Sequence, residues 1–253
     1  MRLLVSVTNA AEARAALAGG ADLIDAKNPA AGALGAVPVE TLRDICASVA
    51  GARPVTAALG DAADEDTIER DALVFACAGA AFVKVGFAGI GSARRIERLI
   101  AAAVRGASAG DGTCGVVAVA YADADAGTSV APTVIAQVAP GGGANGVLLD
   151  TANKRGPGLS GLSTAHALNS WVAAAHDSGL FVALAGRLTP ADLPFVRGCG
   201  ADIAGVRGAA CEGGRTGHVT AERVRLLRAA CDKACVKIEN QLWRSPSGLR
   251  TQG

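Results

Sequence analysis

Eight short runs of β-branched and apolar residues alternate with Ala-, Arg- and Glu-rich segments along nearly the whole chain, which restricts the fold strongly. Strands that alternate with helices pair in parallel through crossover connections. The predicted strands span residues 2–7, 22–26, 54–58, 81–86, 115–121, 145–150, 180–185 and 202–206. The chain has 253 residues, and a (β/α)8 barrel typically takes about 250. We therefore expect an α/β fold, a single (β/α)8 TIM barrel over residues 1–237, followed by a polar C-terminal tail at 238–253.

The segments between the strands have helical character and lie at residues 9–19, 38–50, 64–79, 92–106, 130–139, 160–178, 190–199 and 220–236. Asn9 is expected to cap the first helix, and Pro38 to lie in the first turn of the second. A Gly-Ala-Asp phrase recurs before strands, as at 19–22 and 198–202, which indicates a repeated βα unit. The alternative is a doubly wound sheet, but its usual glycine-rich loop after the first strand is replaced by Thr8-Asn9-Ala10.

Charge and composition exclude several classes of partner. The net charge is +1 and aromatic residues make up 3%, which leaves neither a basic field nor stacking side chains for nucleic acid. No apolar run reaches the roughly 20 residues that span a bilayer. We expect no signal peptide, because the first apolar residues run straight into Thr8-Asn9. The seven cysteines form no CxxC pair and are interpreted as buried hydrophobic residues of a reducing compartment. We expect a cytoplasmic protein that binds neither nucleic acid nor membrane.

Lysine is scarce, since the chain has 19 arginines and only five lysines. Lys27, Lys84 and Lys154 lie in or just beyond the second, fourth and sixth predicted strands, whereas Lys233 and Lys237 lie in or directly after the last predicted helix. The carboxyl ends of barrel strands meet at one face, and alternate strands fill the same interior layers. A buried lysine can lose its proton and attack a carbonyl, which arginine cannot do. We expect these three amines to share one catalytic cavity; a buried ion pair is the alternative role for any single one.

Two aspartates are expected beside these amines. Asp25 has the strand parity of Lys27 and faces the same side of the sheet, where a buried carboxylate needs a cation. Asp150 ends the sixth predicted strand, and Lys154 follows four residues later. Carboxylates at such positions can relay protons for an amine nucleophile. Residue pattern alone does not choose between Lys27 and Lys154 as that nucleophile.

The loops after the seventh and eighth predicted strands combine glycine with arginine. Gly186 and Arg187 follow the seventh strand, and Arg207 and Gly208 follow the eighth. Barrels often bind phosphate with these two loops, because backbone N–H groups approach the anion and arginine donates charge-assisted hydrogen bonds. We expect the four residues to bind a substrate phosphate; a simple turn is the alternative interpretation.

Other polar side chains give weaker indications. Asp123 and Asp125 follow the fifth predicted strand, and they either line the same mouth or are solvated. The three histidines do not cluster with carboxylates at ligand spacing, so we expect no metal and no cofactor. Ser/His/Asp catalysis would need a Gly-x-Ser-x-Gly turn after a strand, which is lacking.

Four segments match a known family: Leu3-Leu4-Val5-Ser6-Val7, Asp22-Leu23-Ile24-Asp25-Ala26-Lys27-Asn28-Pro29 with Gly32-Ala33-Leu34-Gly35, Val83-Lys84-Val85-Gly86, and Leu149-Asp150-Thr151 with Lys154. The Asp-x-Lys-Asn-Pro segment followed by Gly-x-Leu-Gly is the most specific. On these residues the chain resembles the (5-formylfuran-3-yl)methyl phosphate synthases, also called 4-(hydroxymethyl)-2-furancarboxaldehyde-phosphate synthases. The resemblance covers essentially the whole barrel and implies a class I aldolase-like fold.

The resemblance also implies a reaction, catalysed by a carbon–oxygen lyase acting on phosphates. Two molecules of glyceraldehyde 3-phosphate condense, lose phosphate and water, and close to a furan, which begins the synthesis of methanofuran or an analogue used in one-carbon metabolism. By motif it implies Lys27 as the Schiff-base lysine, with Asp25, Lys84, Asp150 and Lys154 as acid–base and substrate-holding groups.

Two other functions are alternatives to this reaction. One is an ordinary class I aldolase acting on a phosphorylated aldehyde, and the other is a barrel that binds a phosphorylated metabolite without turnover. All three have a small phosphorylated molecule as partner, and the sequence leaves open whether the chain forms a homo-oligomer.

Overall fold

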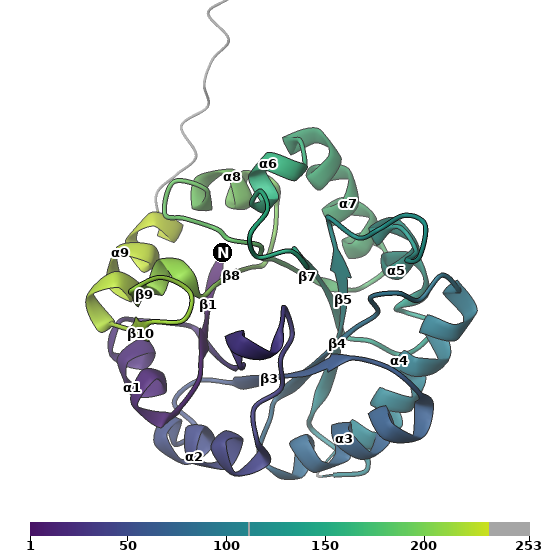
Figure 1. Cartoon of the computed structure of the whole chain (residues 1–253), viewed down its shortest axis with the longest axis horizontal. Helices are drawn as coiled ribbons and strands as arrows, with labels where there is room; N and C mark the ends of the chain where they lie inside the picture. The colour runs from purple at the N-terminus through teal and green to yellow at the C-terminus, as the bar shows by residue number, and fades with distance from the viewer. Residues whose placement is uncertain (111, 233–253) are drawn as a thin grey trace, which may run out of the picture.

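The computed structural model describes residues 1–110 and 112–232, which form a ring of strands surrounded by helices (Figure 1). The strands of the ring are β1 (Arg2–Val7), β2 (Leu23–Ala26), β3 (Val55–Asp61), β4 (Phe82–Gly86), β5 (Gly115–Tyr121), β6 (Gly146–Asp150), β7 (Phe181–Leu184) and β8 (Ile203–Val206). The helices are α1 (Ala10–Ala18), α2 (Val39–Val49), α3 (Glu65–Cys77), α4 (Ala93–Ser108), α5 (Pro132–Val138), α6 (Leu159–Leu162), α7 (Ala165–Asp177), α8 (Leu193–Gly198) and α9 (Ala221–Asp232). The predicted tail at 238–253, the end of the last predicted helix, and Lys233 and Lys237 lie outside the described residues.

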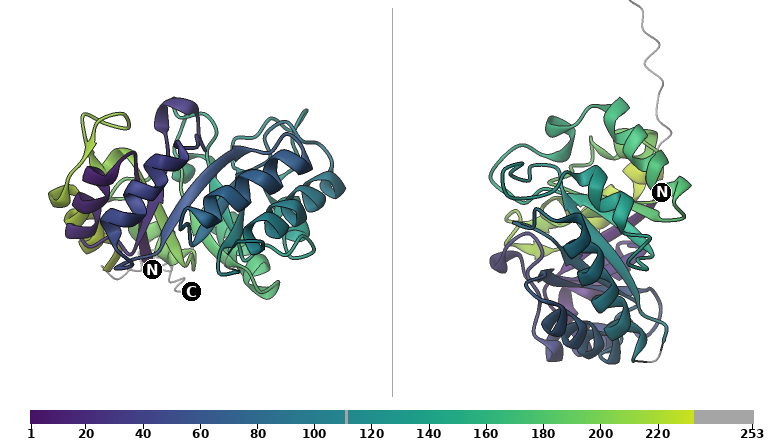
Figure 2. Two further views of the ribbon diagram at one scale, coloured as in Figure 1. Left: turned by 90° about the horizontal axis from the view of Figure 1, so that it is seen from below. Right: turned by 90° about the vertical axis from the view of Figure 1, so that its right-hand side faces the viewer.

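The strands close into a parallel barrel in sequence order, because β1 pairs with both β2 and β8. This closure confirms the predicted (β/α)8 barrel and excludes the doubly wound alternative. The carboxyl ends of the strands open on one face of the ring, and the chain begins on the opposite face (Figure 2). Among the described residues, no helix has the length and apolar character that crossing a membrane requires.

Short polar side chains begin several of the helices. The Oδ1 atom of Asn9 accepts a hydrogen bond from the Glu12 N–H at 3.0 Å, which confirms the predicted cap of α1. The helix predicted at 160–178 is wrong in one respect, because it is divided into α6 and α7. Thr164 is extended there and caps α7 through its hydroxyl. Pro38 lies one residue before α2 rather than in its first turn.

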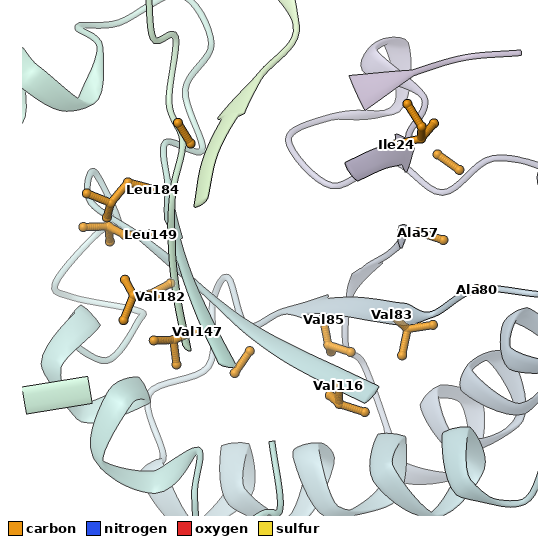
Figure 3. Close-up of a cluster of buried hydrophobic side chains, with 14 of the residues drawn as sticks. Ile24, Ala57, Ala80, Val83, Val85, Val116, Val147, Leu149, Val182 and Leu184 are labelled. Carbon is orange, nitrogen blue, oxygen red and sulfur yellow. The ribbon is translucent and has the colours of Figure 1, made fainter. Parts of the chain in front are cut away.

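The main hydrophobic core lies between the outer face of the barrel and the surrounding helices (Figure 3). Val83 and Val147 are fully buried there, and Leu149 is 4% exposed. Small residues allow close contact, since a Cβ atom at Gly106 of α4 would lie only 1.9 Å from the Glu69 carbonyl oxygen of α3. The Ala- and Gly-rich composition therefore fits helices that pack closely on a sheet and on each other.

Carboxylate and amide side chains cap strands on the face where the chain begins. The Oδ2 atom of Asp22 accepts a hydrogen bond from Leu3 N at 2.7 Å, and Oδ2 of Asp202 accepts one from Val182 N at 2.7 Å. The Oδ1 atom of Asn145 accepts a hydrogen bond from Val116 N of β5 at 2.9 Å. Each side chain satisfies an N–H at the start of the preceding strand. The recurring Gly-Ala-Asp phrase therefore has a structural role, away from the carboxyl face.

Two ordered loops that the sequence did not indicate lie on the carboxyl face. The 3₁₀ turn η1 (Pro29–Ala31) follows β2 and lies over the barrel opening, where it is the dark purple turn in Figure 1. A second 3₁₀ turn, η2 (Gly208–Ala210), follows β8 and leads into the small hairpin of β9 (Cys211–Glu212) and β10 (His218–Val219). Both loops border the interior of the barrel.

Candidate active site

A cavity of about 490 Å³ occupies the interior of the barrel and opens on the carboxyl face. Its volume lies within the range of about 300–1,000 Å³ that is usual for small-molecule sites. The wall combines apolar side chains with charged side chains at several levels of the strands. The charged residues that line it are Arg2, Asp25, Lys27, Lys84, Asp150, Lys154, Arg187, Arg207 and Arg215.

Asp25 and Lys84 form an ion pair in the middle of the barrel. Lys84 Nζ lies 2.5 Å from Asp25 Oδ1, and the two side chains are 5% and 0% exposed. The hydroxyl of Thr56 donates to the same oxygen at 2.8 Å, and that of Ser6 donates to Oδ2 at 2.8 Å. Burial lowers the pKa of Lys84, an effect that Asp25 opposes and the positive charge of Lys27 reinforces.

The position of this pair follows from the register of the sheet. Asp25 is the Cα partner of Ser6 on β1 and of Thr56 on β3, so the three side chains share one interior level. Register partners on parallel strands point to the same face. Ser6 and Thr56 were not predicted as site residues, and strand register is the signal that would have found them.

Asp150 joins the other two lysines at the carboxyl end of β6. Lys154 Nζ donates to Asp150 Oδ1 at 2.6 Å and to the Thr151 hydroxyl at 3.3 Å. Lys27 Nζ lies 3.6 Å from Asp150 Oδ2. The backbone N–H of Thr151 also donates to Asp150 Oδ1, at 2.7 Å. One buried carboxylate therefore lies between two amines.

The charges around Asp150 perturb both it and Lys154. Burial alone would raise the pKa of Asp150, but Lys27, Lys154 and the Thr151 N–H outweigh burial and hold that pKa below its ordinary value. Burial lowers the pKa of Lys154; Asp150 opposes this, and the positive charges of Lys27 and Arg215 add to it. Perturbed titratable groups that converge in a cavity are typical of catalytic sites.

The structure thus brings all five predicted catalytic side chains into one cavity. Lys27, Lys84 and Lys154 come from the end of β2, from β4 and from the loop after β6, as the layering of alternate strands predicts. Their positions agree with the expectation of a shared pocket, while their chemical roles stay predictions.

The loop after β7 has free backbone donors at the cavity mouth. Gly186 has φ 108° and Arg187 has φ 57°, so two consecutive residues adopt the left-handed region, which is uncommon for arginine. A Cβ atom at Gly186 would lie 2.9 Å from the Thr151 side chain. Among the described residues, the backbone N–H groups of Gly186 and Arg187 and the exposed Arg187 guanidinium have no hydrogen-bond acceptor. This loop can bind an anion.

Arg207 has a structural role in addition to lining the cavity. Its guanidinium donates to both carboxylate oxygens of Glu12, to Ser6 O at 3.0 Å, to Gly217 O at 2.9 Å and, through Nε, to Arg215 O at 3.1 Å. These bonds use all five N–H donors of a guanidinium. The Arg207 side chain is therefore not free to bind a phosphate. Of the two residues predicted to do so after β8, Gly208 can still offer its backbone N–H, at the start of η2.

Arg215 is a cavity residue that was not predicted from the sequence. It lies in the loop between β9 and β10 and donates to the carbonyl oxygens of Pro29, at 2.5 Å, and Gly32, at 2.7 Å. Arg215 thus joins the loop after β8 to the loop after β2 across the barrel mouth. Burial lowers its pKa, and Asp150 opposes that effect. The glycine-rich sequence around Arg215 could have suggested a loop. Nothing in the local sequence indicated that its guanidinium binds the carbonyl oxygens of Pro29 and Gly32.

The polar residues of the cavity are amines, guanidiniums, carboxylates and hydroxyls. Within residues 1–110 and 112–232, no group of three or more His, Cys, Asp or Glu side chains is arranged to hold a metal ion. The arrangement instead suits covalent chemistry by an amine, with neighbouring carboxylates to move protons.

Comparison with known proteins agrees with this geometry. Residues 3–228 match the model of the 4-HFC-P synthase family. The (5-formylfuran-3-yl)methyl phosphate synthase of Methanosarcina barkeri is 37% identical over 232 residues, which cover 91% of this chain and 99% of that protein. The enzyme of the same name from Methanocaldococcus jannaschii is 37% identical over 234 residues, covering 91% and 100%.

Solved structures agree on the fold. 3-Hexulose-6-phosphate synthase is similar with a TM-score of 0.62 and 25% identity, over 91% of this chain and 99% of that one. KGPDC from Streptococcus mutans has a TM-score of 0.62 at 16% identity, over 91% and 96% of the two chains. The second likeness concerns the fold alone.

Proposed function

Because the chain belongs to the 4-HFC-P synthase family, we propose that it synthesises (5-formylfuran-3-yl)methyl phosphate, the compound in the names of its relatives. The substrate is glyceraldehyde 3-phosphate, and two molecules condense through a Schiff base in the cytoplasm. Atoms balance when one phosphate and two waters leave as the furan forms. The product serves as the furan part of methanofuran or an analogue.

Lys27 is the nucleophile. The observation that supports this role is the spacing of the three amines from their carboxylates. Lys84 and Lys154 lie at 2.5 and 2.6 Å from theirs, whereas Lys27 Nζ is 3.6 Å from Asp150. The donor–acceptor distance of a normal N–H···O hydrogen bond reaches about 3.2 Å at most. Among the described residues, Lys27 is therefore the amine of the three that no hydrogen bond holds. It can turn toward a substrate carbonyl in the cavity once Asp150 has taken its proton.

Asp150 and Lys154 move protons for this amine. Asp150 Oδ2 faces Lys27, and Asp150 Oδ1 accepts a hydrogen bond from Lys154. A proton that leaves Lys27 can therefore be taken up by Asp150, which also contacts the amine of Lys154. The lowered pKa of Lys154 makes the loss of its proton easier than for an ordinary lysine. Lys154, after passing its own proton to Asp150, removes the proton next to the iminium carbon, and Asp150 delivers the proton it has received to a departing hydroxyl group, which leaves as water.

Lys84 and Asp25 hold the interior end of the substrate, below the mouth. The substrate phosphate binds at the carboxyl face, to the backbone N–H groups of Gly186, Arg187 and Gly208 and to the Arg187 side chain. Arg215, which faces the same cavity, binds the phosphate of the second triose.

An ordinary class I aldolase would use the same amine and the same proton acceptors. It would release a linear sugar phosphate, because it lacks the dehydration steps. A binding barrel without turnover would need neither a free amine nor a buried proton acceptor beside it. The arrangement of Lys27 and Asp150 therefore disfavours the binding barrel.

The test is incubation of the purified protein with glyceraldehyde 3-phosphate. We expect an ultraviolet-absorbing furan aldehyde phosphate and an equal amount of free phosphate. Lys27→Arg keeps the positive charge but cannot form a Schiff base, and should abolish both products. A linear aldol without furan would support the ordinary aldolase instead, and binding without any product would support the binding barrel.

A further inference from the structure

Asp123 connects the loop after β5 to the loop that carries Lys154. Its Oδ1 atom accepts a hydrogen bond from Ala152 N at 2.6 Å, and Oδ2 accepts one from Asn153 N at 2.8 Å. Both bonds are charge-assisted, which makes them shorter and stronger than bonds between neutral groups. One half-buried carboxylate therefore holds two consecutive amides of a neighbouring loop.

The segment that Asp123 holds lies between the two ends of a proton-transfer pair. Thr151 N donates to Asp150, and the next two amides donate to Asp123. This turn brings Lys154 back over Asp150, where its amine also faces Thr151 and the positive charges of Lys27 and Arg215. Lysine has a long flexible stem, so its amine is only as well placed as the backbone that carries it.

We propose that Asp123 is a positioning residue, which sets the amine of Lys154 against Asp150 by fixing the backbone of residues 152 and 153. Its catalytic consequence depends on the proposed function, but the positioning does not. Asp123 is not among the residues that line the cavity, so it acts through Lys154 rather than on the substrate.

The same loop contains a matched control. Asp125 has the same side chain two residues later, but its carboxylate accepts from Gly127 N at 2.9 Å and from the Thr128 hydroxyl at 3.4 Å. Those bonds stay within the loop after β5. Asp125→Asn therefore makes the same chemical change without touching the Lys154 loop.

The experiment compares Asp123→Asn and Asp125→Asn by NMR of protein labelled at the lysine side chains. Only five lysines give signals, so each amine can be titrated by itself. Asparagine keeps one acceptor oxygen but places an NH₂ donor against the other backbone N–H. In Asp123→Asn we expect the pKa of Lys154 to rise toward that of an ordinary lysine, because its amine leaves the buried site. Asp125→Asn should leave it unchanged.

Steady-state kinetics provide the second measurement. Asp123→Asn should lower kcat roughly ten- to hundredfold, the equivalent of one or two hydrogen bonds to a charged group, with little change in KM. In the Lys154→Met background the same change should have no further effect on the residual rate.

An unchanged Lys154 titration in Asp123→Asn, with Lys84 signals showing that the barrel is folded, would overturn the proposal. An equal effect of Asp125→Asn would overturn it too, because it would indicate a general loosening of the loop. If the furan synthesis fails in the wild type, the NMR titration still decides the positioning role by itself.

Discussion

Replacing Lys84 alone should destabilise the protein more than replacing Lys84 and Asp25 together. Lys84→Met leaves the Asp25 carboxylate, which is 0% exposed, with only the hydroxyls of Ser6 and Thr56 as partners. Asp25→Asn together with Lys84→Met removes both charges and keeps an oxygen for those hydroxyls. A buried charge without its counterion costs far more than a neutral pair of similar shape.

The magnitude follows from the geometry of the pair. At 2.5 Å between Nζ and Oδ1, the attraction is roughly 7 kcal/mol for an effective dielectric constant of about 20. Removing both ions from water costs several kcal/mol each, so the intact pair contributes little net stability. Losing one partner forfeits the attraction while the other stays buried, and we expect Lys84→Met to cost about 3–5 kcal/mol. For a chain of this size that lowers Tm by roughly 6–20 °C.

Urea unfolding of the wild type, both single variants and the double variant gives the four free energies of a double-mutant cycle. The double variant should lose less than half as much stability as Lys84→Met. Asp25→Asn should cost less than Lys84→Met, because the already lowered pKa of Lys84 lets that amine become neutral. If the two single effects simply add, the pair is not coupled as described and the reasoning is refuted.

Three further predictions concern charged side chains of the cavity. Arg207→Gln should cost about 3–5 kcal/mol of stability in urea unfolding, because it leaves Glu12 buried without its cation. Arg187→Gln should leave stability unchanged and weaken the binding of inorganic phosphate about tenfold by calorimetry; equal stability losses would contradict this division of roles. Asp150 contributes stability that is present above its ordinary pKa and is lost as pH falls through its lowered pKa. Lys154→Met should reduce the difference between the pKa of Asp150 in the folded and the unfolded chain. Acidification should therefore cost the variant less stability than the wild type, and an equal loss would contradict the prediction.

The barrel and the lysine cluster could be predicted because they depend on local patterns. Strands alternate with helices, and parallel strands bring their carboxyl ends together, so the scarcity of lysine and the order of its strands were enough to place Lys27, Lys84 and Lys154 in one cavity. Strand parity placed Asp25 inside. None of these inferences needs a contact between distant side chains.

The roles of the arginines could not be predicted, because competition between distant groups decides them. Arg207 follows β8 as a phosphate ligand would, but Glu12, 195 residues earlier in the chain, binds its guanidinium. Arg215 reaches the cavity from a hairpin loop and bonds carbonyl oxygens more than 180 residues away. The two bonds from Asp123 to the Lys154 loop likewise depend on the packing of two loops, which residue types do not reveal.

The most direct measurement is to trap the covalent intermediate. Protein incubated with glyceraldehyde 3-phosphate is reduced with borohydride, digested, and examined by mass spectrometry for the modified lysine. The adduct should lie on the peptide that contains Lys27, and it should be absent from Lys27→Arg. An adduct on Lys154 or Lys84, or no adduct during active turnover, would contradict the assignment of the free amine as the nucleophile.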